Sequence, residues 1–410
     1  MTMATTGCEA ARPRLPIGEF IVLIAMLFAL TAFSIDSMLP ALPQIAGELS
    51  SDEPNRAQLI IAGFVLGMGF GTFVTGPISD AIGRRGVILG GAAIYAVGAV
   101  LAWAAPSLEL IIVARFLQGL GAAGPRIAAM ALVRDLYSGR EMARIISVMM
   151  MVFVLVPAVA PLLGSVIIQQ AGWRSIFLAF ILFAGLVSGW FAMRQPETLA
   201  PAHRRPLKFA LIAAATGEVL THRVVVMVTL VMALAFGVLF ATIASVQQVF
   251  DLTFARAESF PSWFAFIALV AGSGNLLNAR LVVRLGMRWM VTATFAAQIV
   301  ISGTMALAFD MGLLTQAGEF WAFLFWVCSI FFTAGLTLGN LNALALEPMG
   351  HIAGTAASIV SAVATVISVA IAAPIGLAFD GTPLPLMNGV LLCCLVALPI
   401  MLLLPRPKRD

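Results

Sequence analysis

The chain has 410 residues, of which 61% are hydrophobic and 10% are charged, and its mean hydropathy is +1.05. No soluble core needs that much apolar surface, so the composition indicates a protein whose main solvent is lipid. The net charge is +4, but the basic residues are dispersed among the connections and form no stripe, so a nucleic-acid partner is not expected.

Twelve apolar runs follow one another along the chain. Each is long enough to cross a hydrocarbon core of about 30 Å, which takes about 20 helical residues. Twelve spans with short connections use nearly the whole length and leave no room for an added soluble domain. The predicted fold class is therefore an all-α polytopic membrane protein, with spans at 17–40, 57–78, 86–104, 108–133, 143–168, 173–193, 223–249, 260–282, 288–309, 318–342, 352–378 and 384–404.

The distribution of basic residues predicts the orientation of the chain. Connections on the side of the N-terminus hold eighteen Lys and Arg residues, whereas the opposite connections hold only Arg56, Arg174 and Arg256. Because Lys and Arg accumulate on the cytoplasmic side of membrane proteins, we expect both termini to be cytoplasmic.

A polar stretch divides the chain near its middle. Residues 194–222 contain three prolines and a basic cluster, which predicts a cytoplasmic linker between an N-terminal six-helix half, 1–193, and a C-terminal six-helix half, 223–410. The halves show a faint repeat, because Gly83-Arg84-Arg85 stands 203 positions before Gly286-Met287-Arg288. Two related halves around a midplane site are the expected architecture of many transporters.

A short charged connection joins the second and third predicted spans. It runs from Gly76 to Arg85 and contains Asp80, Gly83 and Arg84. Its glycines permit a tight turn, and its carboxylate and two guanidinium groups can be held against neighbouring helix ends. The alternative is a solvated turn whose arginines only orient the protein.

Charged residues inside the spans need a reason, since each costs roughly 2.5–3.5 kcal/mol on insertion scales. Asp36 is the first of them, at the end of a mostly apolar run from Phe20 to Ile35. It lies either among the lipid headgroups or at a central cavity, where its carboxyl group would take up and release a proton. We favour the second interpretation.

The fourth span holds two arginines, Arg115 and Arg126. They are eleven residues apart, about three helical turns, so they share one face of the helix. The glycines and alanines among residues 119–124 indicate that this face packs against other helices and not against lipid. Arg115 is the predicted ionic partner of Asp36. Arg126 either faces the cavity or extends its side chain to the cytoplasmic surface.

The fifth span contains Pro157, Pro161 and Gly164, which interrupt the backbone hydrogen bonds on one face. This predicts either an ordinary kinked helix or a face whose carbonyl groups bind water or a neighbouring helix. Additional candidates for the wall of a substrate cavity are one aromatic and several amide side chains, although the amides could equally join helices to one another: Phe28, Gln118, Gln247, Asn275 and Asn340.

The remaining reactive residues form no site that we recognise. The four cysteines, Cys8, Cys328, Cys393 and Cys394, have no metal-ligand spacing and are interpreted as structural. The three histidines all fall in predicted connections. No metal, no cofactor and no enzymatic activity is expected.

Three of these motifs resemble the major facilitator superfamily. Gly76–Arg85 is similar to the signature loop between its second and third helices, and Leu110–Ala123 is similar to its fourth-helix motif. Ser34–Leu49 resembles the first-span motif of one branch, the bicyclomycin and phenicol exporters among the drug/proton antiporters with twelve spans.

The resemblance implies a fold and a set of roles. The fold is two pseudo-symmetric six-helix halves around a central cavity. Asp36 and Arg115 match positions tied to proton coupling. The charged connection matches a cytoplasmic gate, in which Asp80 is expected to meet helix ends of the second half. The residues implied for the gate are Gly76, Asp80, Gly83, Arg84, Arg85 and Asp135, and those implied for the antiporter motif of the fifth helix are Pro157, Pro161 and Gly164.

The chain also departs from that branch. Its fifth helix has Ala160-Pro161 where the motif usually has Gly-Pro, and Ser165 where a second glycine is usual. Phe28 occupies a position where several relatives have a second acid, and Arg126 matches no family motif. The first two departures bear on the number of protons exchanged per substrate, and Arg126 bears on the charge of the substrate.

The implied function is export of small drug-like compounds from the cytoplasm in exchange for protons, by alternating access in a bacterial inner membrane. The expected partners of the monomer are a small-molecule substrate, protons and membrane lipid. An alternative is a dedicated metabolite exporter or a proton-linked solute importer of the same fold. An intramembrane enzyme is not expected, because the sequence contains no catalytic constellation. A channel is not expected either, because a channel has no need of a charged cytoplasmic gate.

Overall fold

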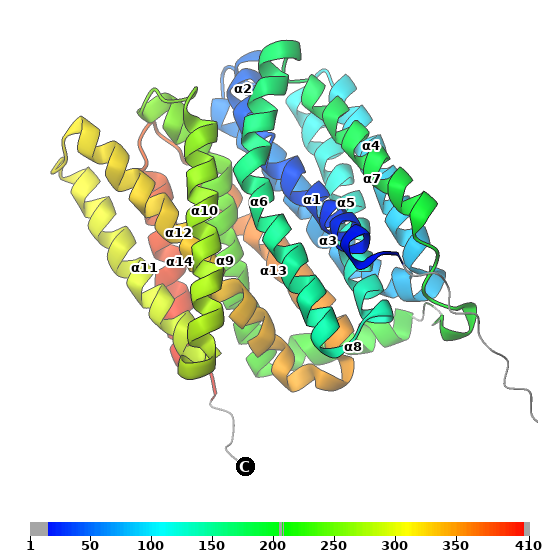
Figure 1. Ribbon diagram of the computed structural model, residues 1–410. Coiled ribbons are helices and arrows are strands. Elements are labelled where there is room, and N and C mark those ends of the chain that lie inside the picture. The colour runs from blue at the N-terminus through cyan, green and yellow to red at the C-terminus, as the bar shows by residue number, and fades with distance from the viewer. Residues whose placement is uncertain (1–14, 205–206, 208, 406–410) are drawn as a thin grey trace, which may run out of the picture.

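The computed structural model describes residues 15–204, 207 and 209–405. Within these ranges the chain is helical and contains no strand (Figure 1). Cys8 lies outside the described residues, and the other three cysteines are buried and free. The long helices are α1 (Ile17–Asp36), α3 (Leu59–Ile82), α4 (Arg84–Ala104), α5 (Leu108–Leu136), α6 (Gly139–Ala171), α7 (Ser175–Arg194), α9 (Arg223–Gln248), α10 (Phe260–Leu285), α11 (Met287–Asp310), α12 (Gln316–Leu346), α13 (Ala353–Leu377) and α14 (Leu384–Leu402).

These helices correspond to the twelve predicted spans. By length and hydropathy the described residues contain eleven candidate spans, and one of them, Gln316–Leu377, is 62 residues long. The short helix η5 (Glu347–Ile352) divides it into α12 and α13, which gives twelve. An even number of crossings brings the start of α1 and the end of α14 to one side, which we call the termini side. The opposite side is called the far side.

The first span is not one continuous helix. We predicted it over 17–40, but α1 ends at Asp36. The short helices η1 (Leu39–Ala41) and α2 (Leu42–Leu49) follow, each with a proline in its first turn. Proline removes a backbone donor and favours the start of a helix, so Pro40 and Pro43 begin new helices where we had extended the old one.

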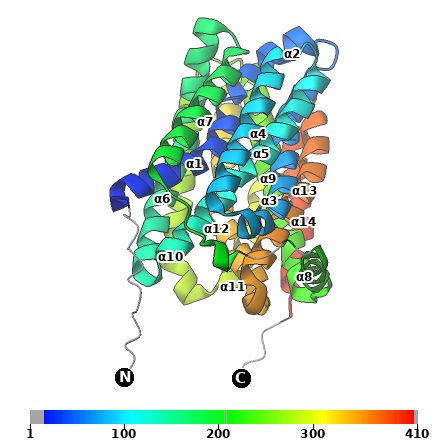
Figure 2. The ribbon, with the colours of Figure 1, turned by 90° about the vertical axis from the view of Figure 1, so that its right-hand side faces the viewer.

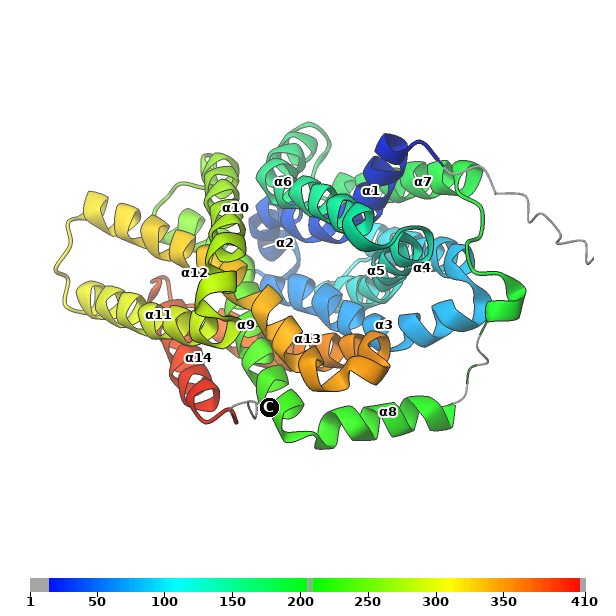
Figure 3. The ribbon, with the colours of Figure 1, turned by 60° about the horizontal axis from the view of Figure 1, so that its bottom comes forward.

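Two pairs of helices carry most of the contact between the halves: α3 with α13, and α6 with α10 (Figure 3). The antiparallel pair α3–α13 keeps one register between Gly69 and Gly76. A Cβ atom on Gly69 would contact Thr365, and one on Gly76 would contact Ser358, so seven residues along one helix match seven along the other. The two halves are therefore closely packed through the middle of the molecule.

The predicted linker contains a helix that we did not foresee. We interpreted residues 194–222 as a polar connection, whereas α8 (Phe209–Thr221) forms within it. It lies on the termini side (Figure 2), where an oxygen atom of the Glu218 carboxylate lies 2.8 Å from Nε2 of His351 on η5. The segment Ala210–Ala215 is apolar, so attention to composition within the linker would have revealed a helix too short to cross a membrane.

The faint sequence repeat has a structural counterpart in the two halves. Gly83 and Gly286 have φ angles of +104° and +83° and immediately precede α4 and α11. Arg85 donates to the carbonyl of Gln195, directly after α7, and Arg288 donates to the carbonyl of Pro405, shortly after α14. In both halves, an arginine after the glycine thus contacts backbone carbonyls that follow the sixth long helix.

Candidate functional site

Asp36 is the last residue of α1 and only 4% exposed. Within the described part of the chain, no ion pair or hydrogen bond connects its carboxylate to another residue. A carboxylate at the C-terminal end of a helix gains nothing from the helix dipole, which is negative there. The structure therefore places at the break in the first span a buried acid that has no cationic partner among the described residues.

Gly164 of α6 makes the break in the first span possible. A Cβ atom at this position would lie 3.0 Å from the carbonyl carbon of Ser37 and would overlap its oxygen. Ser37 directly follows Asp36, and its hydroxyl group donates to the carbonyl of Phe33. Of the three predicted antiporter-motif residues, Pro157 and Pro161 lie inside α6, and Gly164 is where α6 touches the end of α1.

Arg115 is fully buried inside the first half. Its guanidinium group donates to the carbonyl of Ser34 at 2.8 Å and to Oε1 of Gln118 at 2.7 Å. The same group lies 4.4 Å from the ring centroid of Phe64, within range of a cation–π interaction. The hydroxyl groups of Ser34 and Tyr95 are 2.5 Å apart, so one buried polar cluster joins α1, α4 and α5.

Two contacts of this cluster differ from those that we expected. Arg115 contacts the backbone of α1 at Ser34 and makes no ion pair with Asp36 among the described residues, although Ser34 and Asp36 are only two positions apart. Gln118 was predicted to line a substrate cavity, but it is 0% exposed and bonded to Arg115 within the first half. Neighbouring residues on a helix point in different directions, which sequence spacing alone did not resolve for Asp36 and its partner.

Arg126 lies on the same face of α5 as Arg115, as predicted, but in a different environment. Its Nη1 atom lies 3.3 Å from the sulfur atom of Met68 on α3. The side chain is partly exposed and forms no ion pair with any described residue. The structure therefore holds this guanidinium group against α3 and not at the end of α5.

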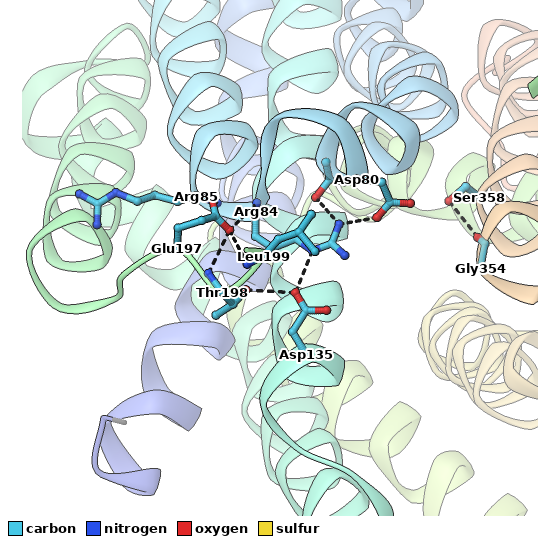
Figure 4. A network of polar contacts seen from close by, with 10 residues as sticks. Asp80, Arg84, Arg85, Asp135, Glu197, Thr198, Leu199, Gly354 and Ser358 are labelled. Atoms are coloured by element: carbon cyan, nitrogen blue, oxygen red, sulfur yellow. Dashed lines mark hydrogen bonds and ion pairs between the residues drawn. The ribbon is translucent and has the colours of Figure 1, made fainter. Parts of the chain in front are cut away.

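Three of the predicted gate residues, Asp80, Arg84 and Asp135, meet on the termini side (Figure 4). Arg84 donates to Asp80 at 2.6 Å and to Asp135 at 2.9 Å. A Cβ atom on Gly76 would lie 3.1 Å from the hydroxyl oxygen of Ser358 on α13. One helical turn further along the same register, Asp80 lies level with Gly354, in the first turn of α13. Among the described residues, however, Asp80 forms no hydrogen bond with the second half.

Glu197 of the linker is a member of this network that the sequence analysis missed. Its carboxylate accepts from the backbone N–H groups of Arg84 and Arg85, each at 3.0 Å, at the start of α4. An acidic side chain at a helix N-terminus satisfies free N–H groups and complements the helix dipole. A Cβ atom on Gly83 would overlap this carboxylate, so the glycine is needed for space as well as for its positive φ.

A cluster of uncharged side chains joins the two halves on the far side. We call it the far-side cluster: Asn55, Gln58, Ser245 and Gln248. Asn55 donates to the carbonyls of Leu377, at 3.1 Å, and Phe379, at 2.7 Å. Gln248 donates to Asn55 at 2.6 Å and accepts from Gln58, which in turn accepts from Ser245 at 3.0 Å.

Every hydrogen bond given above for the far-side cluster joins a residue of the first half to a residue of the second half. Beside it, a cavity of about 10 Å³ lies between α3, α9 and α13, room for about one water molecule. The sequence signal was weak, because Asn55 and Gln58 stand at the start of a predicted span, where polar residues are ordinary.

The other cavity candidates are dispersed. Phe28 is buried and packs edge-on against Phe153 of α6, with ring centroids 6.3 Å apart. Gln247 is 3% exposed, and its Oε1 atom has no hydrogen-bond partner among the described residues. Asn340 donates to Asn278 at 2.7 Å and so joins α12 to α10, which is the alternative that we had left open. Asn275 is exposed on α10.

The residues that the structure describes contain no group of three or more His, Cys, Asp or Glu side chains able to hold a metal ion. The arrangement instead provides, among the described residues, a buried acid and a partly exposed arginine that have no ionic partner, and polar networks at both ends of the helices. Such features suit a protein that moves a solute between two sides.

Comparisons with known proteins agree with this description. A profile of the Major Facilitator Superfamily matches residues 22–373. The chain is 28% identical over 347 residues to a bicyclomycin resistance protein homolog of Haemophilus influenzae, and the match covers 84% of this chain and 85% of that protein. It is 33% identical over 187 residues to a chloramphenicol resistance protein of Pseudomonas aeruginosa, where the match covers 45% and 44%.

The fold is also shared with solved structures. A crystal structure of a D-xylose-proton symporter superposes with a TM-score of 0.71 at 15% sequence identity, covering 94% of this chain and 97% of that one. At this identity the likeness establishes the fold alone. The predicted fold class and the predicted resemblance to drug antiporters are confirmed.

Proposed function

This chain belongs to the Major Facilitator Superfamily, and we propose that it is a proton-coupled exporter of small drug-like compounds from the bacterial cytoplasm. Relatives named for resistance to bicyclomycin and to chloramphenicol support this class of substrate. The observation that carries the proton coupling is Asp36, a buried acid without a cationic partner among the described residues, at the break in the first span.

Proton binding at Asp36 would act on the contact between α1 and α6. Burying a charge in a membrane costs roughly 2.5–3.5 kcal/mol on insertion scales, and a bound proton removes that charge. Asp36 adjoins Ser37, which packs on Gly164 of α6. Neutralising the carboxylate therefore changes the electrostatics beside a close helix contact, and α6 in turn packs on α10 of the second half.

We assign the termini side to the cytoplasm, since the connections on that side hold eighteen Lys and Arg residues and the opposite connections hold three. The network around Arg84 is then the cytoplasmic gate, and the far-side cluster is the external one. A membrane potential contributes about 2.3 kcal/mol per charge per 100 mV, and a pH difference about 1.36 kcal/mol per unit. Proton entry can thus support a large gradient of substrate.

One observation favours a second candidate function. Arg126 has no anionic partner among the described residues, as expected if the natural substrate is a single anionic metabolite. A dedicated exporter or a proton-linked importer of such a compound would share the same fold and the same proton site.

The test is proton release from acidified everted vesicles, measured by dye dequenching, when chloramphenicol, bicyclomycin or a lipophilic cation is added. We expect responses to several compounds. Asp36→Asn should abolish them while the protein remains inserted, because the neutral amide cannot exchange a proton. Asp310→Asn, which removes an exposed carboxylate at the end of α11, is the matched control and should leave the responses unchanged.

Two outcomes would contradict the proposal. Wild-type responses from Asp36→Asn would remove this residue from the coupling mechanism. Silence across the whole panel from inserted wild-type protein would exclude multidrug export and favour the dedicated transporter. The direction of proton flux then separates export from import.

A further inference from the structure

We propose that Arg126 forms an anion-binding subsite at the middle of the transport path, and that preferred substrates carry a carboxylate or a similar anionic group. The inference rests on the proposed function, because it assumes that substrate passes between the two halves at this level. It goes further in naming the charge of the substrate and the residue that selects it.

The guanidinium group of Arg126 lies deep between the two ends of the helices. Its contact, Met68, is the tenth of the 24 residues of α3, about 14 Å along the helix from Leu59 and about 21 Å from Ile82. A snorkelling arginine would point toward the termini side, where α5 ends. Arg126 instead reaches a residue near the middle of α3, which excludes the surface position that the sequence left open.

The contact of Arg126, Met68, lies beside the place where the two halves meet. Met68 precedes Gly69, where an added Cβ atom would lie 2.9 Å from a methyl carbon of Val366 on α13. Val366 is the fourteenth of the 25 residues of α13 and therefore also lies near the middle of its helix. Transporters of this architecture bind their substrates at the midplane, where the two repeats meet. Arg126 contacts Met68, beside that place, from the first half.

Arg126 lacks a counter-ion in the described part of the chain. There, the sulfur atom of Met68 is its only hydrogen-bond acceptor, and a thioether is a weak one. Asp36 is too far away to be that counter-ion. It lies two residues from Ser34, whose carbonyl contacts Arg115. Arg115 is in turn about 16 Å from Arg126 along α5. Most of the donors of this guanidinium group therefore lack an acceptor from the described residues.

Arg115 shows what a structural arginine looks like in the same helix. It is 0% exposed, bonded to a backbone carbonyl and to Gln118, and covered by an aromatic ring. Arg126 is partly exposed and has no such partners among the described residues. A planar guanidinium group with free donors binds a carboxylate through two parallel hydrogen bonds. Of these two arginines of α5, Arg126 is the one available to a ligand.

The experiment compares probes that differ in charge on one scaffold. Chloramphenicol is neutral and its hemisuccinate ester is an anion; nalidixic acid is an anion and its methyl ester is neutral. Binding to the purified full chain in detergent is measured by titration calorimetry. The variants are Arg126→Gln, Arg126→Lys and, as the matched control, Arg280→Gln, which removes an exposed charge on α10.

We expect each anionic probe to bind the wild-type chain more tightly than its neutral partner. Arg126→Gln should weaken the binding of the anionic probes about tenfold and that of the neutral ones less than about twofold, since a charged hydrogen-bonded pair is worth more than a neutral contact. Arg126→Lys should retain part of the preference, because it keeps the charge but loses the paired donors. Arg280→Gln should change none of these affinities.

The inference is overturned if anionic and neutral partners bind equally, or if Arg126→Gln weakens both to the same extent. Proton release from vesicles, recorded with the same probes, tests the proposed function separately. Proton release with chloramphenicol, but no binding of either anion, would leave the exporter in place and remove the anion subsite. A charge preference that depends on Arg126, without any proton release, would keep the subsite and remove proton-coupled export.

Discussion

Single glycine positions set how closely the helices of this protein approach one another. Gly164 leaves room for the backbone of Ser37 directly after Asp36, and Gly83 leaves room for the carboxylate of Glu197. In both places a missing side chain brings a backbone or a charged group within contact distance. The positions of the residues proposed to bind protons or to form a gate thus depend on neighbouring glycines, which have no side chain.

The consequence for Gly164 can be measured. Gly164→Ala adds a methyl group that overlaps the carbonyl of Ser37, so we expect a loss of about 1–3 kcal/mol in the stability of the folded chain, the usual cost of overpacking. The readout is the thermal unfolding temperature of the purified protein in detergent. Gly185→Ala on α7 is the matched control, because nothing lies within 4 Å of its Cβ position. Equal unfolding temperatures for the two variants would contradict the packing described here.

At the scale of elements, the linker is part of the proposed cytoplasmic gate and not only a tether. Glu197 binds the start of α4, and Thr198 donates to Asp135 at 3.0 Å at the end of α5. Further along, α8 reaches the second half through Glu218 and His351. The linker therefore contacts both halves on the termini side, and movement of the halves must alter at least one of these contacts.

Removing the carboxylate of Glu197 should loosen the linker. In Glu197→Gln the N–H groups of Arg84 and Arg85 lose a charged acceptor, a change of about 1 kcal/mol for a helix cap. We expect faster trypsin cleavage after Arg194 or Arg204 in proteoliposomes, with a small fall in unfolding temperature. Glu258→Gln removes an exposed carboxylate elsewhere and should not alter the cleavage rate. Unchanged cleavage of the Glu197 variant would show that the cap does not hold the linker.

At the scale of the whole molecule, the two ends of the helix bundle are held differently. On the termini side, the contacts of Arg84 among the described residues lie within the first half and the linker, and Gly76 meets Ser358 by packing. On the far side the halves are joined by hydrogen bonds between uncharged groups. Neutral amides exchange partners with water at little net cost, which suits a contact that would open and close in the proposed transport cycle.

Breaking the far-side cluster should favour opening on that side. Gln248→Leu removes the hydrogen bonds to Asn55 and Gln58, so we expect faster amide hydrogen exchange at 55–59 and 377–379 in nanodiscs. Thr253→Val is the matched control, because Thr253 donates to the carbonyl of Gly381 within the second half. If both variants exchange alike at these segments, the cluster does not hold the halves together.

The sequence by itself determined the features of this protein that depend on residues close together in the chain. Hydropathy over about 20 residues located the twelve spans, and the motifs around Gly76–Arg85 and Leu110–Ala123 were enough to indicate the superfamily. Glycine with positive φ before α4 and α11 follows from the same kind of local signal. These features depend on residues that are close together in the chain, so their pattern is visible in a single sequence.

Only the tertiary structure decided which side chains meet. Arg115 binds Ser34 and not Asp36, Arg126 reaches the middle of α3, and Gln248 bonds to Asn55 from the other half. Each of these contacts joins residues at least 58 positions apart, and each depends on the rotation of one helix against another. Helical periodicity predicts which residues share a face, but the packing of all twelve helices sets what that face contacts.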